Sequence, residues 1–230
     1  GRLYIGDIYK KVFGSHRNIP SLKSMYYKMN LTGRWANMKY SDAELDYLDK
    51  IIDHSKDIAC VYSELKQVCN KYGISDLHTN TLYETPQFVY MRVALGSMNN
   101  RSSSTRIHDV VNVYNLLSNK EINAPTPYML YFGTPHRGLS SCCLYTADDN
   151  IGSLAAGDHI AYMMTAMSAG IGAHIQTRSI GDPVRGGSII HQGKLPYYRA
   201  LEGVLLANKQ GSRSGAATVH YCVLDPEIFD

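Results

Sequence analysis

The pattern of apolar residues changes near Pro125. Upstream, apolar side chains recur every three or four positions over long stretches, which is typical of amphipathic helices. Downstream, short apolar runs bounded by proline, glycine and serine alternate with longer helical stretches, which favours an α/β arrangement. We therefore predict a mainly helical domain over residues 1–124 and an α/β domain over residues 125–230.

Helix-start signals mark the first domain. A capping box begins at Ser41, Thr85 stands as an N-cap before a proline, and a serine-rich turn at residues 102–104 leads into a further helix. Residues 1–40 have a poor period, with one helix start near Ser21. The apolar helix faces comprise Leu45, Leu48, Ile51 and Ile52; Ile58, Tyr62, Leu65 and Cys69; Phe88, Met91 and Leu95; and Ile107, Val110, Val111, Tyr114 and Leu117.

The second domain is predicted as short strands alternating with helices. Pro-Thr-Pro and Gly-Thr-Pro bound the apolar run 128–132, so we interpret this run as a buried strand or an extended segment. Further strands are predicted at residues 140–146, 173–177 and 218–224, and helices at residues 151–169 and from Pro196 to Gln210.

Two hydroxyl residues precede the cysteine pair Cys142-Cys143. A cysteine in an apolar strand is usually a small buried hydrophobe. Hydroxyls beside a thiol would equally suit a polar substrate and thiol chemistry, and the residues alone leave both interpretations open. The five cysteines include no Cys-x-x-Cys pair, which excludes a zinc site or a secreted disulfide framework and makes a reducing compartment the default.

Composition excludes several classes of protein. The net charge of +3 is small and the basic residues are scattered, so we expect no nucleic-acid partner, and a glycine-rich RNA-binding protein is disfavoured. No apolar run approaches the roughly 20 residues of a membrane span, and no signal-peptide pattern is present. We expect no bound metal and no membrane association.

Three glycine-containing loops accompany arginines, at residues 169–172, 181–187 and 211–215. Exposed backbone amides in such loops can hold phosphates. The alternative is that the glycines make tight turns and the arginines face solvent. None of the loops is a Walker A or Gly-x-Gly-x-x-Gly sequence.

An ordered set of motifs covers most of the chain. It consists of Tyr83-Glu84-Thr85-Pro86-Gln87-Phe88-Val89-Tyr90-Met91-Arg92, Pro125-Thr126-Pro127, Ser140-Ser141-Cys142, Ser168-Ala169-Gly170-Ile171-Gly172, Arg178-Ser179-Ile180-Gly181-Asp182-Pro183-Val184-Arg185-Gly186-Gly187 and Gln210-Gly211-Ser212-Arg213-Ser214-Gly215-Ala216-Ala217-Thr218. In sequence, order and spacing the set resembles the large (catalytic) subunit of class I ribonucleotide reductases. The resemblance implies an N-terminal helical region followed by the first part, about half, of a ten-stranded α/β barrel.

The resemblance also implies roles for individual residues. Cys142 matches the cysteine that is oxidised as the ribose is reduced. The positions that match substrate-binding residues are Thr126, Ser141, Ala169, Gly170 and Arg213. The positions that match the site of a deoxynucleoside triphosphate or ATP effector are Asp149, Ile151, Arg178, Val184 and Gln210. The loop that begins at Gln210 would relay the identity of the effector base to the substrate site.

The sequence also departs from the family. It contains no Asn-x-Cys-x-Glu motif, second redox cysteine or C-terminal cysteine pair, and it has no counterpart of the ATP-binding cone. We therefore expect the N-terminal part of a split or truncated subunit, of a kind found in some phages, that works with a C-terminal fragment of the large subunit. Cys222 has no catalytic counterpart, and we interpret it as strand packing.

The family further implies a metal-containing small subunit that generates the radical, thioredoxin or glutaredoxin as reductant, and homodimerisation through the helices of the effector site. The expected location is the cytoplasm, that of a host if the chain is phage-encoded. The alternative interpretation is a noncatalytic regulatory module that binds deoxynucleoside triphosphates.

Overall fold

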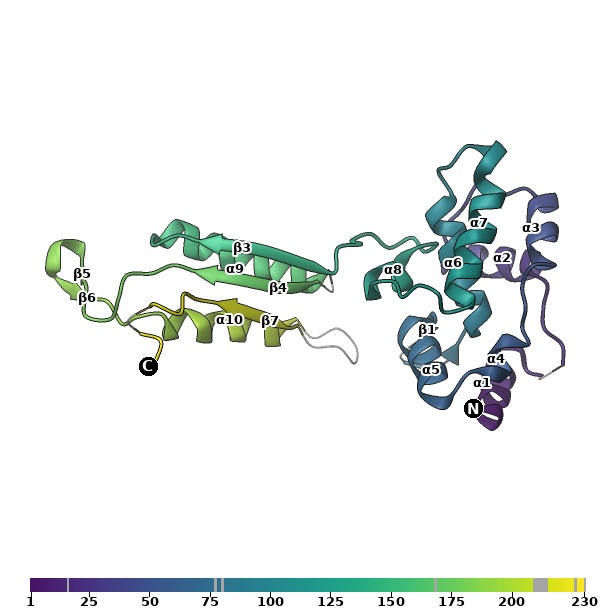
Figure 1. Ribbon diagram of the computed structural model, residues 1–230, viewed down its shortest axis with the longest axis horizontal. Helices are drawn as coiled ribbons and strands as arrows, with labels where there is room; N and C mark the ends of the chain where they lie inside the picture. The colour runs from purple at the N-terminus through teal and green to yellow at the C-terminus, as the bar shows by residue number, and fades with distance from the viewer. Residues whose placement is uncertain are drawn as a thin grey trace. The chain divides into compact units, whose positions relative to one another are not determined.

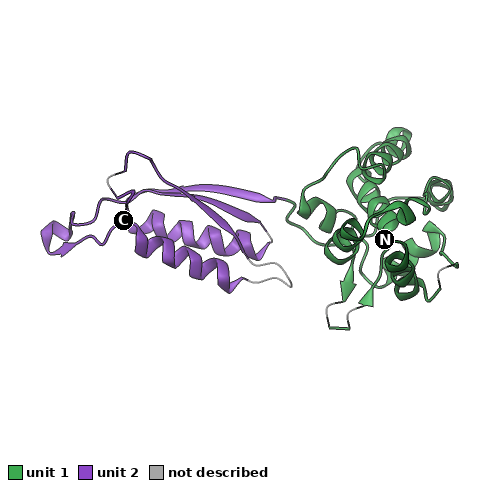
Figure 2. Ribbon diagram, turned by 60° about the horizontal axis from the view of Figure 1, so that its bottom comes forward, with its two compact units in different colours: residues 1–139 green, residues 140–230 purple. Residues whose placement is uncertain are grey.

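The computed structural model describes residues 1–15, 17–76, 78–79, 81–167, 169–208, 215–225 and 227–229 (Figure 1). The chain divides into two compact units, Gly1–Leu139 and Ser140–Asp230, which we call the helical unit and the sheet unit (Figure 2). The division falls after Leu139, whereas the sequence placed it after residue 124. The intervening residues include a helix that packs in the helical unit.

The helical unit contains helices of very different lengths. They are α1 (Arg2–Phe13), α2 (Leu22–Leu31), α3 (Asp42–Asp49), α4 (Lys56–Ala59), α5 (Tyr62–Gln67), the π-helical turn η1 (Val68–Tyr72), α6 (Pro86–Met98), α7 (Ser103–Ser118) and α8 (Thr126–Tyr131). A short antiparallel pair, β1 (Ser75–Asp76) and β2 (Thr81–Leu82), precedes α6.

The predicted helix starts are confirmed. The capping box at Ser41 is complete, since its hydroxyl accepts from the Glu44 amide at 3.3 Å and its own amide donates to the Glu44 carboxylate at 2.7 Å. Ser21 caps α2 by accepting from the amide of Ser24. Thr85 is the N-cap residue of α6, although its hydroxyl makes no capping hydrogen bond.

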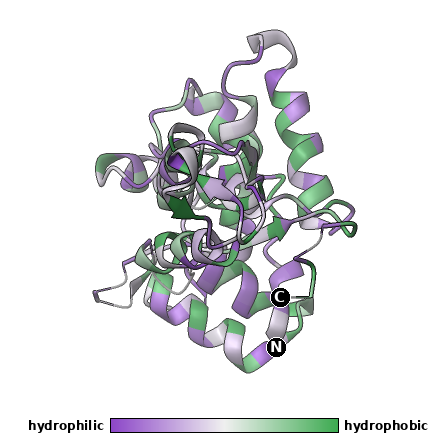
Figure 3. Ribbon diagram, turned by 90° about the vertical axis from the view of Figure 1, so that its left-hand side faces the viewer, coloured by the Kyte–Doolittle hydropathy of each residue, from purple (hydrophilic) through white to green (hydrophobic). Residues whose placement is uncertain are grey.

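Helix α6 forms the centre of the helical unit. Its residues from Pro86 to Leu95 are all buried, so the other helices surround it on every side. Most helices in Figure 3 carry both hydrophobic and hydrophilic segments, as expected where one side faces the core. Cys60 and Cys69 are buried and free, in agreement with their predicted role in packing.

The prediction of a strand or extended segment at residues 128–132 is wrong, because residues 128–131 lie within α8 and Phe132 is its C-cap. Pro127 lies in the first helical turn, where a proline costs no hydrogen bond because the missing amide would have had no partner in the helix. A short apolar run does not distinguish a strand from a short buried helix, and here the packing against α6 decides.

The sheet unit is built from two successive β-α-β crossovers. Its elements are β3 (Cys142–Ala147), α9 (Ile151–Ala166), β4 (Gly170–Ile175), β5 (Pro183–Val184), the 3-10 turn η2 (Arg185–Gly187), β6 (Ile189–Ile190), α10 (Leu195–Ala207) and β7 (Ala217–His220). The strands β3, β4 and β7 form a parallel sheet in that order, with Cys142 opposite Gly170 and Ile171 opposite Ala217. Figures 1 and 2 show α9 and α10 side by side along one face of this sheet.

The two faces of the sheet differ in burial. Residues that face α9 and α10, such as Ala147, Ile171 and Ala173, form the core of the unit together with Leu154, Ala161 and Leu201. The alternate residues face the other side, where no described element of the sheet unit packs, and Leu144 there is 82% exposed. We call this side the open face.

The predicted strand at 140–146 and the predicted helix from residue 151 are confirmed. Strand β4, however, begins at Gly170 rather than at residue 173, so Gly170 and Gly172 are strand residues and not turn residues. Strand β7 ends at His220, four residues earlier than predicted. The predicted end of the last helix at Gln210 lies outside the described residues.

The longest helices, α7 and α9, each have 16 residues. In the ranges that the structure describes, no helix has the length and apolarity needed to cross a membrane.

Candidate functional site

The amino ends of β3 and β4 bring four of the predicted site residues together. Cys142 and Gly170 are paired in register, and the Gly170 amide donates to the Ser141 carbonyl at 2.8 Å. A Cβ atom on Gly170 would lie 3.8 Å from the Cys142 sulfur, so the absence of a side chain leaves space beside the thiol. Ser141, Cys142, Ala169 and Gly170 therefore share one edge, which we call the thiol edge.

The two adjacent cysteines point to opposite faces of the sheet. Cys142 is exposed and belongs to the open face, whereas Cys143 is half-buried and packs toward the helices. Alternation along a strand produces this difference. The interpretation as a buried hydrophobe therefore applies to Cys143 and not to Cys142.

The third strand starts at the same edge. The Ile171 amide donates to the Ala216 carbonyl at 3.0 Å, immediately before β7. Gln210 and Arg213 lie outside the described residues. Ala216, which directly precedes β7, lies next to Gly170, since a Cβ atom on Gly170 would be 3.9 Å from the Ala216 carbonyl oxygen. Thr126 is the first residue of α8 and therefore belongs to the helical unit, not to the unit that carries the thiol edge.

The carboxyl ends of β3 and β4 gather a second predicted set. The Arg178 guanidinium pairs with the Asp149 carboxylate at 2.9 Å and donates to the Pro183 carbonyl at 3.1 Å, which places it beside Val184. Ile151 begins α9 and is 75% exposed. We call this edge the arginine edge.

The amino terminus of α9 points to the arginine edge. Asn150 caps it by accepting from the Ser153 amide at 2.8 Å, and the Ser153 hydroxyl accepts from the Asp148 amide. A 16-residue helix carries a partial positive charge at this end, which favours anions. The arginine and the helix terminus are therefore suited to a phosphate group.

A hairpin of β5 and β6 extends from the arginine edge. Its tip turns through η2, where Arg185 adopts a left-handed conformation with φ 51° and Gly186 and Gly187 also have positive φ. The predicted glycine-rich loop is thus a hairpin tip, in which the glycines supply a backbone conformation that other residues rarely adopt.

The base of the hairpin is held by the segment that follows β7. The Glu227 carboxylate accepts from the Ile180 amide at 2.5 Å and from the Lys194 amide at 3.3 Å, and the Lys194 ammonium pairs with Asp225. Glu227 was not predictable from the sequence, because no local signal connects it with residues more than 30 positions earlier.

The two edges lie at opposite ends of the same strands. Strands β3 and β4 have six residues each, which at about 3.3 Å per residue separates the edges by about 16 Å. The Cys142 thiol at one end and the Arg178–Asp149 pair at the other therefore belong to the same pair of strands.

Two domain models of one family match this chain in succession. The ribonucleotide reductase all-alpha domain matches residues 60–137, and the ribonucleotide reductase barrel domain matches residues 140–230. The chain belongs to the ribonucleotide reductase large-subunit family. The predicted fold class, a helical region followed by the first part of the α/β barrel, is thereby confirmed.

Relatives in this family match almost the whole chain. It is 33% identical to the ribonucleoside-diphosphate reductase 1 subunit alpha of Escherichia coli over 232 residues, which covers 99% of the chain and 30% of the relative. The corresponding subunit of Enterobacteria phage T4 is 31% identical over 192 residues, 83% of the chain and 25% of the relative. The chain thus spans about a third or less of the length of these relatives.

The barrel-domain match has the same bounds as the sheet unit, whereas the all-alpha match covers residues 60–137 of the helical unit. The barrel-domain match begins at residue 140, where the sheet unit begins.

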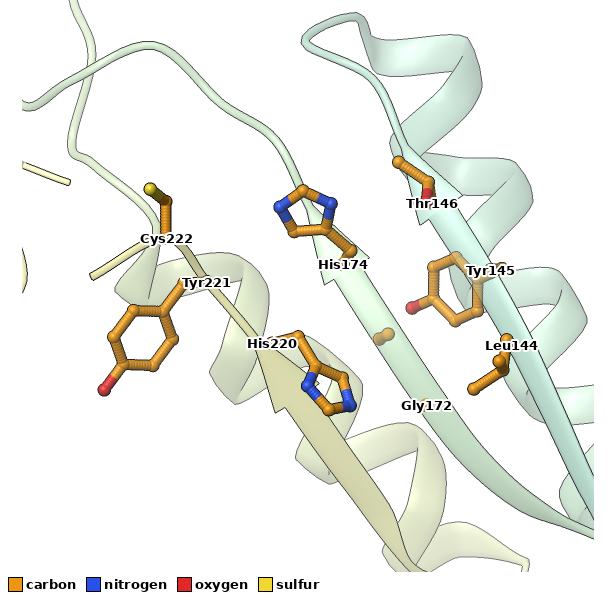
Figure 4. Close-up of a pocket in the computed structure, with 9 residues that line it drawn as sticks. Leu144, Tyr145, Thr146, Gly172, His174, His220, Tyr221 and Cys222 are labelled. Carbon is orange, nitrogen blue, oxygen red and sulfur yellow. The ribbon is translucent and has the colours of Figure 1, made fainter. Parts of the chain in front are cut away.

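The open face of the sheet unit forms a groove of about 570 Å³, and Figure 4 shows Leu144, His174 and His220 around it. His174 and His220 are paired in register on neighbouring strands, and no sequence motif had pointed to either of them.

Cys222 also borders this groove of the ribonucleotide reductase barrel. It is exposed and follows the end of β7, so the interpretation as strand packing is wrong. The described residues contain no group of three or more His, Cys, Asp or Glu side chains that could hold a metal ion.

Proposed function

We propose that this chain is the part of a ribonucleoside-diphosphate reductase large subunit that supplies one redox cysteine, part of the substrate pocket and the specificity-effector site. The observation that carries the proposal is the placement of Cys142. Its thiol is exposed on the open face, beside the side-chain-free Gly170 and the end of the loop that precedes β7.

In the proposed reaction, Cys142 is one of two thiols that reduce the ribose. A thiyl radical first abstracts the 3' hydrogen of the nucleotide, and the 2' hydroxyl then leaves as water. The thiol pair supplies two electrons and two protons and becomes a disulfide, and the 3' hydrogen is returned. One ribonucleotide and one dithiol thus give one deoxyribonucleotide, one disulfide and one water.

Neither the thiyl cysteine nor the second redox cysteine is among these 230 residues in the sequence context of the family. Polypeptide outside these residues, continuous with the chain or separate from it, would supply both. It would also cover the open face, where Leu144 is 82% exposed. A small subunit with a metal centre would supply the radical, and thioredoxin or glutaredoxin would reduce the disulfide in the cytoplasm.

Substrate binding is assigned to the thiol edge and to the residues that match the family pattern. The hydroxyls of Thr126 and Ser141 would position the diphosphate and ribose beside the Cys142 thiol. Ala169, Gly170 and Arg213 would also contact the substrate. Orientation of this kind can lower a barrier by roughly 7 kcal/mol or more in well-aligned cases.

The effector is assigned to the arginine edge. Asp149, Ile151, Arg178, Val184 and Gln210 would bind a deoxynucleoside triphosphate or ATP, with Arg178 and the amino terminus of α9 facing its phosphates. The support is that Arg178 is already oriented by Asp149 and the Pro183 carbonyl.

Homodimerisation is assigned to the helices next to the effector. Helix α9 exposes a series of large apolar side chains, and α10 exposes Leu206. Exposed apolar surface of this kind marks protein contacts. The exposed large apolar residues of α9 are Ile151, Ile160, Tyr162 and Met163.

The test is Cys142→Ser in the complete enzyme, with Cys143→Ser as the matched control on the opposite face of the same strand. We expect Cys142→Ser to abolish thiol-dependent ribonucleotide reduction and to preserve effector binding. Cys143→Ser should retain turnover, because its side chain packs toward the helices.

The second candidate is a noncatalytic regulatory module that binds deoxynucleoside triphosphates. It is favoured by the arginine edge, where Asp149 and the Pro183 carbonyl of this chain orient Arg178 without any other polypeptide. Tight effector binding together with full tolerance of Cys142→Ser would support that function and contradict the catalytic one.

A further inference from the structure

A buried ion pair occupies the motif that begins at Tyr83. Glu84 and Arg92 are both 0% exposed, and the Arg92 Nε donates to the Glu84 carboxylate at 2.8 Å. The proposed function assigns no role to either residue. Buried charges are costly unless fully hydrogen-bonded, so their partners indicate what the pair holds in place.

Arg92 binds the carboxyl end of α8. Its Nη1 donates to the Phe132 carbonyl at 2.5 Å, and its Nη2 donates to the carbonyls of Met129 at 3.1 Å and Tyr72 at 3.0 Å. The last carbonyls of a helix have no partner within the helix, so the guanidinium supplies the missing donors. The contacts join α6, α8 and the end of η1.

Glu84 fixes the orientation of the guanidinium. Its carboxylate also accepts from the indole nitrogen of Trp35 at 2.7 Å and from the Ile74 amide at 2.8 Å. Every strong donor around the carboxylate therefore comes from a buried or half-buried group, and the side chain has little freedom to move.

Close backbone packing also holds α6 against the chain that follows α8. A Cβ atom on Gly96 would lie 2.0 Å from the Gly133 nitrogen, and one on Gly133 would lie 2.5 Å from the Arg92 carbonyl. Gly133 also has φ 77°, which other residues rarely adopt. Helix α6 and the chain just after α8 are thus in direct backbone contact.

Among the residues that the structure describes, no side chain caps the other end of α8. Its N-cap residue is Pro125, which makes no side-chain capping bond, and Thr126 is the first helical residue. A six-residue helix places Thr126 only about 8 Å from the carbonyls that Arg92 holds. The position of Thr126 is therefore set from the carboxyl end of the helix.

We propose that Arg92, oriented by Glu84, is a positioning residue that places Thr126 for the diphosphate of a ribonucleotide substrate. The inference rests on the proposed function, because the role of Thr126 comes from that proposal. Arg92 touches neither substrate nor reacting atoms, and its effect passes through α8.

The test is Arg92→Lys in the complete enzyme, because an ammonium keeps the charge but cannot reproduce a fork that serves a carboxylate and several carbonyls. We expect the KM for the ribonucleoside diphosphate to rise about tenfold or more, as for a misplaced positioning group. The effector concentration for half-maximal activation should not change, because the effector site lies in the other unit.

Arg106→Lys is the matched control. Arg106 is also a buried arginine of the helical unit, paired with Glu44 at 2.7 Å and stacked on the Tyr40 ring at 4.6 Å, but none of these partners belongs to α8. Its KM should equal that of the wild type. An equal rise in both variants would overturn the inference, since it would show a general loss of stability.

Thr126→Val and the double variant test the route of the effect. If Arg92 acts through Thr126, Thr126→Val alone should raise KM and adding Arg92→Lys should raise it little further. A KM of the double variant that is raised by the product of the two single-variant increases would overturn the inference. Should Arg92→Lys fail to fold, Glu84→Gln keeps the shape of the partner and should give the same KM rise on a smaller scale.

The proposed function and this inference fail differently. A wild-type enzyme that reduces no ribonucleotide overturns both. An active wild-type enzyme whose KM is unchanged in Arg92→Lys and Glu84→Gln overturns the inference alone.

Discussion

The helical unit and the sheet unit handle their buried groups in opposite ways. The helical unit closes around α6 and buries charged and polar side chains such as Asp57, Glu84 and Arg92, which hydrogen-bond to other buried groups of the unit. The sheet unit forms a core on one face of its sheet only, and its Arg178–Asp149 ion pair is more than a third exposed. Polar groups thus hold helices together inside the first unit, whereas in the second they lie at the surface of a sheet with one uncovered face.

The buried networks of the helical unit link helices that are distant in sequence. The Asp57 carboxylate accepts from the Tyr9 hydroxyl at 2.8 Å and from the Gln87 amide at 3.0 Å, and the Gln87 carbonyl in turn accepts from the Tyr114 hydroxyl at 2.6 Å. These bonds join α1, α4, α6 and α7. Each removed partner would leave a buried polar group unsatisfied.

The largest effect should come from breaking the buried pair in the helical unit. Glu84→Ala leaves the Arg92 charge uncompensated, which should lower the free energy of unfolding by about 3–5 kcal/mol. Leu144→Ala on the open face should change it by no more than about 0.5 kcal/mol, because that side chain is 82% exposed. Urea unfolding of the chain measures both, and similar losses would contradict the contrast between the units.

The second effect concerns pH. Burial raises the pKa of Asp57 from 3.8 to about 7, against the opposing hydrogen bonds from Gln87 and Tyr9. The folded helical unit thus binds this proton more tightly than the unfolded chain, so the stabilising contribution is complete below about pH 4 and is lost as the pH rises through about 7. The free energy of unfolding should fall across this range.

Asp57→Asn should flatten this pH dependence, since the amide has the same shape and does not titrate. Asp53→Asn is the control: a hydrogen bond from Ser55 lowers the pKa of Asp53, so its contribution is lost only at lower pH, outside this window. The measurement is the urea midpoint of the wild type and of both variants between pH 4 and pH 8. A wild-type profile that rises with pH would refute the role given to Asp57.

The smallest effect on stability should come from the arginine edge. Arg178 and Asp149 are each more than a third exposed, so Arg178→Gln should cost less than about 1 kcal/mol of unfolding free energy. The same change should weaken deoxynucleoside triphosphate binding about tenfold or more, as expected for the loss of a charged phosphate contact. Titration calorimetry measures this binding, with exposed Arg199→Gln as the control that should bind normally. Unchanged binding in Arg178→Gln would place the effector elsewhere.

Elements with strong local signals were predictable from the sequence. The capping box at Ser41, the proline at the start of α6 and the helix after Asn150 all depend on groups within a few residues of one another. Helix α8 was not predictable in the same way, because Arg92, which satisfies its last carbonyls, lies more than 30 residues earlier. Gly170 and Gly172 were misinterpreted because glycine is common in turns and the pairing with β3 became visible only in the sheet.

The candidate site was likewise predictable only in part from the sequence. The resemblance identified Cys142 and Arg178, but only the structure shows that Cys142 shares an edge with Gly170 and that Arg178 is oriented by Asp149 at the other end. Glu227 and the pair His174 and His220 escaped notice, because their neighbours come from distant segments.

By itself, the sequence determined the helical periodicity of the first unit, the helix caps, and a strand in which Cys142 and Cys143 must face opposite sides. It did not determine which of the two thiols would be accessible. The tertiary structure decided this, because α9 and α10 pack on the Cys143 side of the sheet and leave the Cys142 side open. Local rules set the alternation along a strand, and only contacts between distant segments choose the face that is buried.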